Sequence, residues 1–197
     1  MPHPNLFRAE LRSKLETGVP IGRREGRRLP SNVPFVVDTI WEFTRPPSMP
    51  SRRNSVYASP TPALALAGAS QGGAGPDDYQ ACRLELVGSP RLMQLAVEDA
   101  RGHPDVEAVQ KAILRVLRQD GWAMTTLAHK LALAPLFVPG VTRAELVEAM
   151  ARDALLAELV RAAAAAVTIW TPAPSNDRGE VFFELDEGQA YILHPLG

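Results

Sequence analysis

Cysteine is almost absent from this chain of 197 residues, because Cys82 is the only one. A single thiol excludes an internal disulfide framework and a cysteine-rich zinc site. It is typical of a protein that works in a reducing compartment. Hydrophobic residues make up 46% of the chain, so we expect a fold that its apolar core stabilises without covalent cross-links.

Long uninterrupted apolar runs are also lacking, and no stretch reaches the ~18 residues that a membrane-spanning helix needs. The alanine-rich segment before residue 167 is interrupted by Arg152, Asp153, Glu158 and Arg161. The first residues, MPHPNLFRAELRSKLE, lack the apolar region of a signal peptide. The sequence therefore predicts no membrane association. It predicts a cytoplasmic protein, or one delivered to a target cell by a signal-independent route.

Several signatures of common enzyme classes are missing. The net charge of −1 gives no global attraction to nucleic acid or to an anionic membrane. The chain has no P-loop, no GxSxG nucleophile elbow and no GxGxxG after a strand, which argues against three large classes of nucleotide-binding and hydrolytic sites. The histidines are scattered and form no HExxH pattern, so no metal site is predicted. They are His3, His103, His129 and His194.

The segment 45–73, RPPSMPSRRNSVYASPTPALALAGASQGG, is the most informative stretch that is present. Its first prolines prevent regular structure. The run SVYAS at residues 55–59 favours a short strand, and Pro60 and Pro62 end it. The alternating Ala and Leu residues from 63 to 69 favour a helix that packs closely. This order places Tyr57 and Ser59 at the end of a strand, where ligands often bind.

Further strands are predicted near both ends of the chain. Residues 5–9 (NLFRA) suit a first strand, although the following AELRSKLE also suits a helix start with Arg8 on its exposed face. Residues 81–87 alternate apolar and polar side chains, as a half-buried strand does. Residues 179–185 and 190–194 read as two more strands, joined by a tight hairpin-type connection at residues 186–188.

The middle of the chain reads as helical. Apolar spacing predicts a helix at residues 33–43, and a largely helical region from 89 to 167. Ser89-Pro90 predicts a helix start, as does Pro104 for residues 105–119. Residues 122–133 form another helical run. The capping-box pattern of Thr142 and Glu145 predicts a long helix to about residue 166. Because strands flank these helices, the predicted class is α+β.

Two arginine-rich segments are candidates for phosphate binding, because guanidinium groups match phosphate oxygens. One is GRREGRR at residues 22–28, and the other is the pair Arg52 and Arg53 before the strand at 55–59. A run such as the first segment is more often a solvated loop.

The segment VYASPTPALALAGA resembles the second strand and following helix of the ADP-ribosyltransferase superfamily. RPPSMP resembles the NPPG-type turn of its RES-domain relatives. Arg8 in LFRA is similar to the arginine of LYRG, which holds the nicotinamide-ribose end of NAD in that family, although Ala9 replaces the usual glycine. The resemblance covers the N-terminal third and the C-terminal strands, and the helical middle has no counterpart.

The resemblance implies a single ADP-ribosyltransferase-like domain over residues 1–197, with 89–167 as a helical insertion or layer. The expected fold is α+β, with a split mixed or antiparallel sheet. The expected activity uses NAD as co-substrate and transfers ADP-ribose to a protein or nucleic-acid acceptor, with release of nicotinamide. The resemblance also implies a toxin or effector role and a cognate inhibitor protein.

The same resemblance implies roles for individual residues. Glu180, at the start of a late strand, would be the catalytic carboxylate that stabilises positive charge on the ribose. Tyr57 would stack on nicotinamide, and Ser59 would bind the ribose or position Glu180. Arg8 would bind NAD, and Arg53 with its neighbour Arg52 would meet the diphosphate. Glu184 lies four residues after Glu180 on the same strand face and is the competing carboxylate.

Two alternatives stay open at the level of the sequence. One is an NAD glycohydrolase or phosphorylase of the RES type. The other is a non-enzymatic α+β interaction module that binds a protein partner through its helical region. The enzyme hypothesis requires that Arg8, Tyr57 and Glu180 come together at one site.

Overall fold

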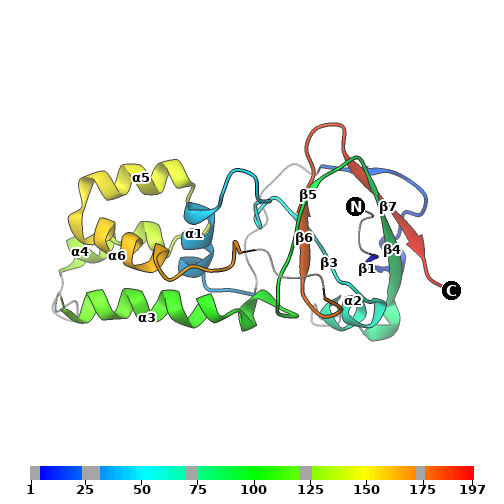
Figure 1. The fold of residues 1–197 in the computed structure, drawn as a ribbon, viewed down its shortest axis with the longest axis horizontal. Helices are drawn as coiled ribbons and strands as arrows, with labels where there is room; N and C mark the ends of the chain where they lie inside the picture. Colours follow the sequence, from blue (N-terminus) through cyan, green and yellow to red (C-terminus); the bar gives the residue numbers. More distant parts are fainter. Residues whose placement is uncertain (1–4, 24–31, 70–74, 120–125, 172–175) are drawn as a thin grey trace. The chain divides into compact units, whose positions relative to one another are not determined.

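The computed structural model describes residues 5–23, 32–69, 75–119, 126–171 and 176–197, and the statements below concern these residues. The chain divides into two compact units, which we describe separately. The sheet unit comprises residues 1–26, 48–99 and 172–197, and the helical unit comprises residues 27–47 and 100–171. The fold is α+β, with six α-helices and two antiparallel sheets in the described part (Figure 1).

The larger sheet has four antiparallel strands in the order β1-β4-β7-β2. Strand β4 alternates as its sequence predicts, because Cys82 and Leu84 are buried while Arg83 and Glu85 are exposed. The strand predicted at residues 5–9 is confirmed as β1, and only a short 3-10 turn follows it. The strands are β1 (Leu6–Leu11), β2 (Ile21–Gly22), β4 (Tyr79–Val87) and β7 (Ala190–Pro195).

The smaller sheet has three antiparallel strands in the order β3-β6-β5. They are β3 (Val56–Ala58), β5 (Arg91–Gln94) and β6 (Val181–Glu184). Figure 1 shows β6 running alongside both partners. Because side chains alternate along a strand, Val181 and Phe183 point to one face and Phe182 and Glu184 to the other.

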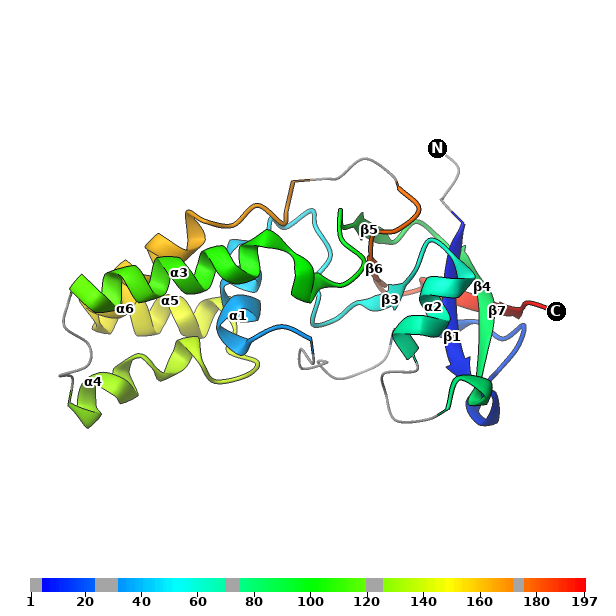
Figure 2. The same cartoon turned by 90° about the horizontal axis from the view of Figure 1, so that it is seen from below.

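Side chains from both sheets form one hydrophobic core. Phe183 of β6 meets Tyr191 of β7 edge to face, with ring centroids 6.0 Å apart. A single β-bridge between Phe7 and Ser59 links the two sheets directly. Helix α2 (Pro62–Ala69), which the sequence predicts, packs against β1 and β4 (Figure 2). The buried members are Leu6, Ala58, Cys82, Leu84, Val181, Phe183, Leu185, Tyr191 and Leu193.

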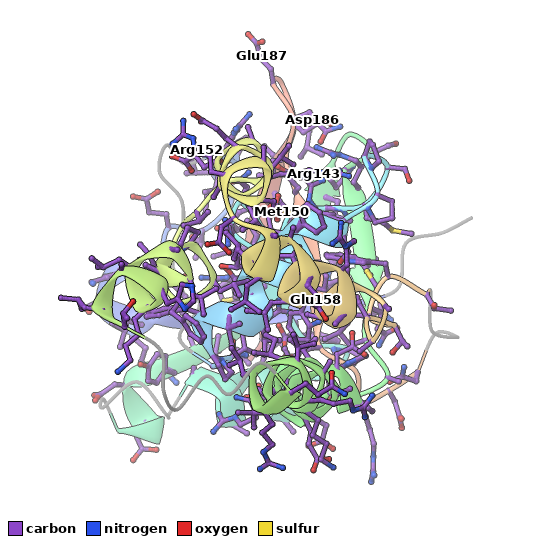
Figure 3. The ribbon with its side chains drawn as sticks, turned by 90° about the vertical axis from the view of Figure 1, so that its left-hand side faces the viewer. Arg143, Met150, Arg152, Glu158, Asp186 and Glu187 are labelled. Atoms are coloured by element: carbon purple, nitrogen blue, oxygen red, sulfur yellow. The ribbon has the colours of Figure 1, made fainter. Side chains whose placement is uncertain are left out.

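The predicted hairpin between the last two strands is wrong. A turn does form, because Gln189 N–H donates to the Asp186 carbonyl at 3.1 Å and Gly188 takes a positive φ of 78°. However, β6 and β7 belong to different sheets. Figure 3 labels Asp186 and Glu187 at this turn. Tight-turn residues are compatible with a hairpin, but Phe183 and Tyr191 instead meet across the core from separate sheets.

In the described part, the helical unit contains five α-helices; α1 and α6 pack against each other, and each of them also packs against α3 and α5. Helix α3 confirms its predicted period, since Val109, Ile113, Val116 and Leu117 are buried at spacings of three and four residues. The helices are α1 (Phe35–Thr44), α3 (Pro104–Gln119), α4 (Leu127–Ala132), α5 (Arg143–Arg152) and α6 (Ala154–Ala164).

The helix predicted to start at Ser89-Pro90 is wrong, because strand β5 follows instead. Leu92 and Met93 pair in register with Phe183 and Phe182 of β6. Leu92 and Met93 therefore point to opposite faces of a sheet. Two adjacent apolar residues also occur in helices, so a short stretch of sequence does not distinguish this strand from a helix. Residues 89–99 consequently belong to the sheet unit, not to the helical region.

The single long helix predicted after Thr142 is also wrong, although its start is confirmed. The capping box forms, since Thr142 Oγ1 accepts from Glu145 N–H and Glu145 Oε2 accepts from Thr142 N–H. Asp153 then takes an extended conformation, with φ −136° and ψ 115°. Its carboxylate caps Leu156 N–H at 2.8 Å and starts α6. Figure 3 shows Arg152 on α5 and Glu158 on α6.

Some predictions fall outside the described residues. They concern most of the arginine-rich segment at 22–28, the end of the segment 45–73, and the beginning of the helical run at 122–133. Within the described part, no helix is long and apolar enough to cross a membrane.

Candidate functional site

One face of β6 carries both candidate carboxylates. Glu180, Phe182 and Glu184 alternate along the chain and share this side, which we call the carboxylate face. The strand register places Tyr57 of β3 opposite Phe182 and Arg91 of β5 opposite Glu184. The three-stranded sheet therefore presents acidic, basic and aromatic groups together, while its other face enters the core.

Arg52 binds Glu180 on the carboxylate face. Its Nη1 lies 3.1 Å from Glu180 Oε1, and both side chains are at least nine-tenths buried. The guanidinium carbon also lies over the rings of Tyr57 and Phe182, at 5.2 and 5.1 Å from their centroids. These distances fall within the range of cation–π attraction. One carboxylate and two aromatic rings thus surround a single planar cation.

The backbone that carries Arg52 is held in a hydrogen-bonded turn. Asn54 N–H donates to the Ser51 carbonyl at 3.1 Å, and Ser55 Oγ donates to the same oxygen at 2.6 Å. The Tyr57 hydroxyl donates to the Arg52 carbonyl at 2.7 Å. Tyr57 therefore contacts Arg52 twice, through its ring and through its hydroxyl, and positions the turn over β6.

Glu184 fastens this turn to the sheet. Its Oε2 accepts from Ser51 N–H at 2.9 Å and lies 3.1 Å from Arg91 Nη2, while Oε1 accepts from Asn54 Nδ2 at 3.2 Å. Both carboxylate oxygens are thus engaged by groups that define local structure. Glu180 instead pairs with Arg52, the cation that lies over the two aromatic rings, so the two candidate carboxylates have different surroundings.

The segment before β6 fixes where Glu180 begins the strand. Asn176 Oδ1 accepts from the N–H groups of Arg178 and Gly179, at 3.0 and 2.5 Å. Gln94 Nε2 donates to the carbonyls of Asn176 and Gly179, at 2.8 and 3.2 Å. The Glu180 backbone then pairs with neighbours on the β5 side, since its N–H donates to the Val97 carbonyl at 2.8 Å.

Gly179 makes the closest approach in this segment. A Cβ at this position would lie 1.7 Å from the carbonyl oxygen of Leu95, which no side chain tolerates. Only glycine therefore allows the chain to pass Leu95 and deliver Glu180 to the carboxylate face.

The structure brings most of the predicted site residues together. Arg8 Nη1 donates to the backbone carbonyl of Tyr57 at 3.0 Å, and its Nε lies 3.4 Å from a carboxylate oxygen of Glu10. Arg8 thus joins the group through the backbone of Tyr57, and not through Glu180. Ser59 follows Ala58, whose register partner is Val181, so it lies at the same end of β6 as Glu180.

Arg53 was predicted to meet a diphosphate, and the structure places it in the same turn as Arg52. Its side chain is 4% exposed. Sequence reasoning did not anticipate that Arg52, and not its neighbour, would pair with Glu180. The only signal for that contact is the adjacency of a basic pair to a strand that carries an aromatic residue.

A second buried polar cluster lies in the helical unit and was missed by sequence reasoning. Asp105, 1% exposed, accepts hydrogen bonds from Trp41 Nε1 at 3.1 Å, Thr168 Oγ1 at 2.7 Å and the Ile169 N–H at 2.9 Å. His103 Nδ1 lies 3.5 Å from its Oδ1. Burial acts to raise the pKa of Asp105, but these hydrogen bonds outweigh burial and lower the pKa to about 2. This carboxylate therefore joins α1, α3 and the segment after α6.

Among the described residues, no group of three or more His, Cys, Asp or Glu side chains is arranged to hold a metal ion. Comparison of this chain with protein-family models, with curated proteins and with solved structures found no significant match.

Proposed function

We propose that this protein is an ADP-ribosyltransferase that uses NAD as co-substrate and releases nicotinamide. The observation that carries the proposal is the placement of Glu180, which is buried immediately before β6 and pairs with Arg52, the cation that lies over the ring of Tyr57. We further propose that the two antiparallel sheets correspond to the split sheet of the ADP-ribosyltransferase fold, with the helical unit as an addition to it.

Glu180 would stabilise the positive charge that develops on the ribose as nicotinamide leaves. A carboxylate held in a site with little water does this well, because its interaction with the developing cation is weakly screened. Its charge matters most in the transition state, so it acts on the chemical step more than on NAD affinity. Glu184 is the weaker candidate, since the Ser51 N–H, Asn54 and Arg91 engage both of its oxygens.

The remaining candidates would bind NAD around this carboxylate. Tyr57 would offer its ring to nicotinamide, and Ser59 would hydrogen-bond the ribose from the same end of β6. Arg8 would act at the nicotinamide-ribose end, where it already holds the backbone of Tyr57. Arg53 would meet the diphosphate from the turn that carries Arg52.

The acceptor would be a protein or a nucleic acid, and the activity would serve a toxin or effector that a cognate inhibitor protein restrains. We propose that the protein acts where NAD is present, in the cytoplasm or in a target cell to which it is delivered. These assignments rest on the resemblance of the sequence to the family.

An assay with NAD labelled in the ADP-ribose part tests the proposal. The full chain is incubated with labelled NAD and whole-cell extract, and released nicotinamide and labelled macromolecules are measured separately. Nicotinamide release with transfer of label supports the transferase. Release without transfer supports the glycohydrolase or phosphorylase of the RES type. A folded chain that leaves NAD intact excludes all three activities.

A second candidate function is protein interaction through the helical unit. Leu127 and Leu131, one turn apart on α4, are 71% and 64% exposed, and Phe137 and Val138 are about half exposed. Such exposed apolar groups favour association. Sedimentation of the chain and of a Leu127→Lys/Leu131→Lys variant tests self-association. A concentration-dependent dimer in the parent chain alone, without consumption of NAD, would favour this function over the enzyme.

A further inference from the structure

Arg52 has the surroundings of a bound ligand, although it is part of the chain. Its guanidinium is planar and cationic, lies over two aromatic rings, and pairs with a carboxylate at 3.1 Å. The two rings are themselves neighbours, with centroids 6.1 Å apart and planes inclined by 35°. They belong to adjacent strands, and the strand register places them opposite each other.

This arrangement selects a planar cation by two independent features. Aromatic faces attract a flat cation through their negative quadrupole, and a flat group covers them better than a tetrahedral one. The carboxylate of Glu180 adds charge neutralisation in a buried position. A neutral ring would stack on the two aromatic rings but would not pair with the carboxylate. A compact ammonium ion would pair with the carboxylate but would stack less.

We propose that Tyr57, Phe182 and Glu180 form a binding site for a planar organic cation, and that Arg52 is a built-in competitor that must leave before the ligand enters. The inference rests on the proposed function for the identity of that ligand, because the nicotinamide ring of NAD is a planar cation. The competitor role of Arg52 is additional to that function.

The backbone and the side chain of Arg52 make different contacts. The Tyr57 hydroxyl donates to the Arg52 carbonyl, and the N–H of Ser51 at the start of the turn donates to the Glu184 carboxylate. The guanidinium is attached through a flexible chain of methylene groups. Departure of the guanidinium from Glu180 and the two rings therefore leaves these backbone contacts in place.

Competition of this kind lowers the apparent affinity for the ligand. If Arg52 occupied the site in about 99% of molecules, the apparent dissociation constant would rise about 100-fold over its intrinsic value. A macromolecule that drew Arg52 away would raise affinity by the same factor. The closed site thus makes NAD binding depend on a second event.

The test uses 1-methylnicotinamide, methylated on the ring nitrogen, as a planar cationic probe, with neutral nicotinamide and non-planar tetramethylammonium as comparisons. Binding to the full chain and to Arg52→Ala is measured by calorimetry. We expect Arg52→Ala to bind 1-methylnicotinamide at least about 10-fold more tightly than the parent chain, and to prefer it to both comparison compounds. Arg91→Ala, which removes the cation beside the other carboxylate, should bind like the parent chain.

A second measurement covers the case in which Arg52→Ala folds poorly because it leaves Glu180 buried without its cation. Methylguanidinium at low concentration should then raise the melting temperature of Arg52→Ala, while sodium chloride should not. The double variant Arg52→Met/Glu180→Gln, which removes both charges, should bind neither cation.

Three results would overturn the inference: equal probe affinity in the parent chain and Arg52→Ala, no preference for planar cations, or no rescue by methylguanidinium. Failure of the proposed function is visible separately. A chain whose Arg52→Ala variant binds the planar cation but never consumes NAD keeps the cation site and loses the transferase. A chain that releases nicotinamide while its Arg52→Ala variant gains no affinity keeps the transferase and loses the competitor.

Discussion

Arg8 of β1 donates a 3.0 Å hydrogen bond to the backbone carbonyl of Tyr57 on β3, and so ties one sheet to the other at the candidate site. Sequence reasoning grouped these two residues through their expected contacts with NAD. The structure groups them through the backbone, which means that Arg8 acts on Tyr57 even without a ligand.

NAD should raise the melting temperature of the protein, because a ligand that binds only the native state stabilises it, by about 2.7 kcal/mol at a concentration 100-fold above the dissociation constant. Arg8→Ala should reduce this response, and thermal denaturation with and without NAD measures the change. Arg12→Ala is the control, since Arg12 is an exposed arginine that contacts the Asp77 carbonyl and Gln80. An unchanged NAD response in folded Arg8→Ala would remove Arg8 from the site.

Glu180→Gln should abolish most of the activity. The change keeps the size of the side chain and removes its charge, so the rate of nicotinamide release should fall roughly 10²–10³-fold. NAD affinity should change far less, because the variant loses the attraction of Glu180 for the competing Arg52 together with its attraction for the nicotinamide ring, whereas the transition state needs the charge in full. Single-turnover release and equilibrium NAD binding, measured on the same preparation, separate the two effects.

Glu184→Gln serves as the matched change on the same strand. It weakens contacts to the Ser51 N–H, Asn54 and Arg91, so the melting temperature should fall while folded molecules retain most of their rate. If Glu184→Gln is inactive although folded, and Glu180→Gln is active, the catalytic carboxylate has been assigned to the wrong residue.

Gly179→Ala should displace Glu180. The new methyl group would meet the Leu95 carbonyl at 1.7 Å, so the backbone must shift, and overpacking of this kind costs about 1–3 kcal/mol. Stability and nicotinamide release should both fall. Gly68→Ala is the control in the same unit, because its Cβ meets nothing within 4 Å and it lies in helix α2. Equal behaviour of the two variants would contradict the close approach seen at Gly179.

The helical unit should lose stability in acid through Asp105. Its pKa falls from 3.8 in the unfolded chain to about 2 in the fold. A lowered pKa means that the stabilisation is fully present above pH 4 and is lost as the pH falls toward 2, and a shift of this size corresponds to about 2 kcal/mol. Denaturant titrations followed by tryptophan fluorescence should show this loss as the pH falls from 4 to 2.

Asp105→Asn should flatten that part of the pH profile and lower stability at neutral pH. Glu107→Gln, an exposed change on the same helix, should leave the profile intact. A profile that is the same in the parent chain and in Asp105→Asn would show that Asp105 is not the group that titrates.

Cys82 should resist thiol reagents in the native protein. It is fully buried in the core of the sheet unit, and burial, followed by the charge of Glu10, raises the pKa of its thiol. Reaction with a chromogenic disulfide should be at least about 100-fold slower than in concentrated denaturant, since it requires local opening. Rapid native reaction would show that β4 does not hold Cys82 inside.

Local sequence signals predicted a helix or strand correctly where its own residues carry the pattern, as buried and exposed side chains or as a helix cap. The alternation around Cys82 predicted β4, the period of α3 predicted its buried residues, and Thr142 with Glu145 predicted the start of α5. Each of these signals lies within a few residues of the element that it specifies.

The errors arose where a distant partner decides the structure. Leu92 and Met93 form a strand because β6, about 90 residues later, offers Phe183 and Phe182 as partners. The same holds at the candidate site, since 128 residues separate Arg52 from Glu180. No local pattern specifies which of two adjacent arginines turns toward a carboxylate that far along the chain.

The order of strands has a consequence for how the protein is made. Strand β6 is the central strand of its sheet and β7 is one of the two inner strands of the other, and both come after all of their partners in the chain. While the ribosome is still synthesising residues 181–195, β3 and β5 have no strand between them, whereas the helical unit is already complete at residue 171. Strand edges exposed in this interval favour chaperone binding or aggregation. The carboxylate face therefore does not exist until β6 has emerged from the ribosome and lies between β3 and β5.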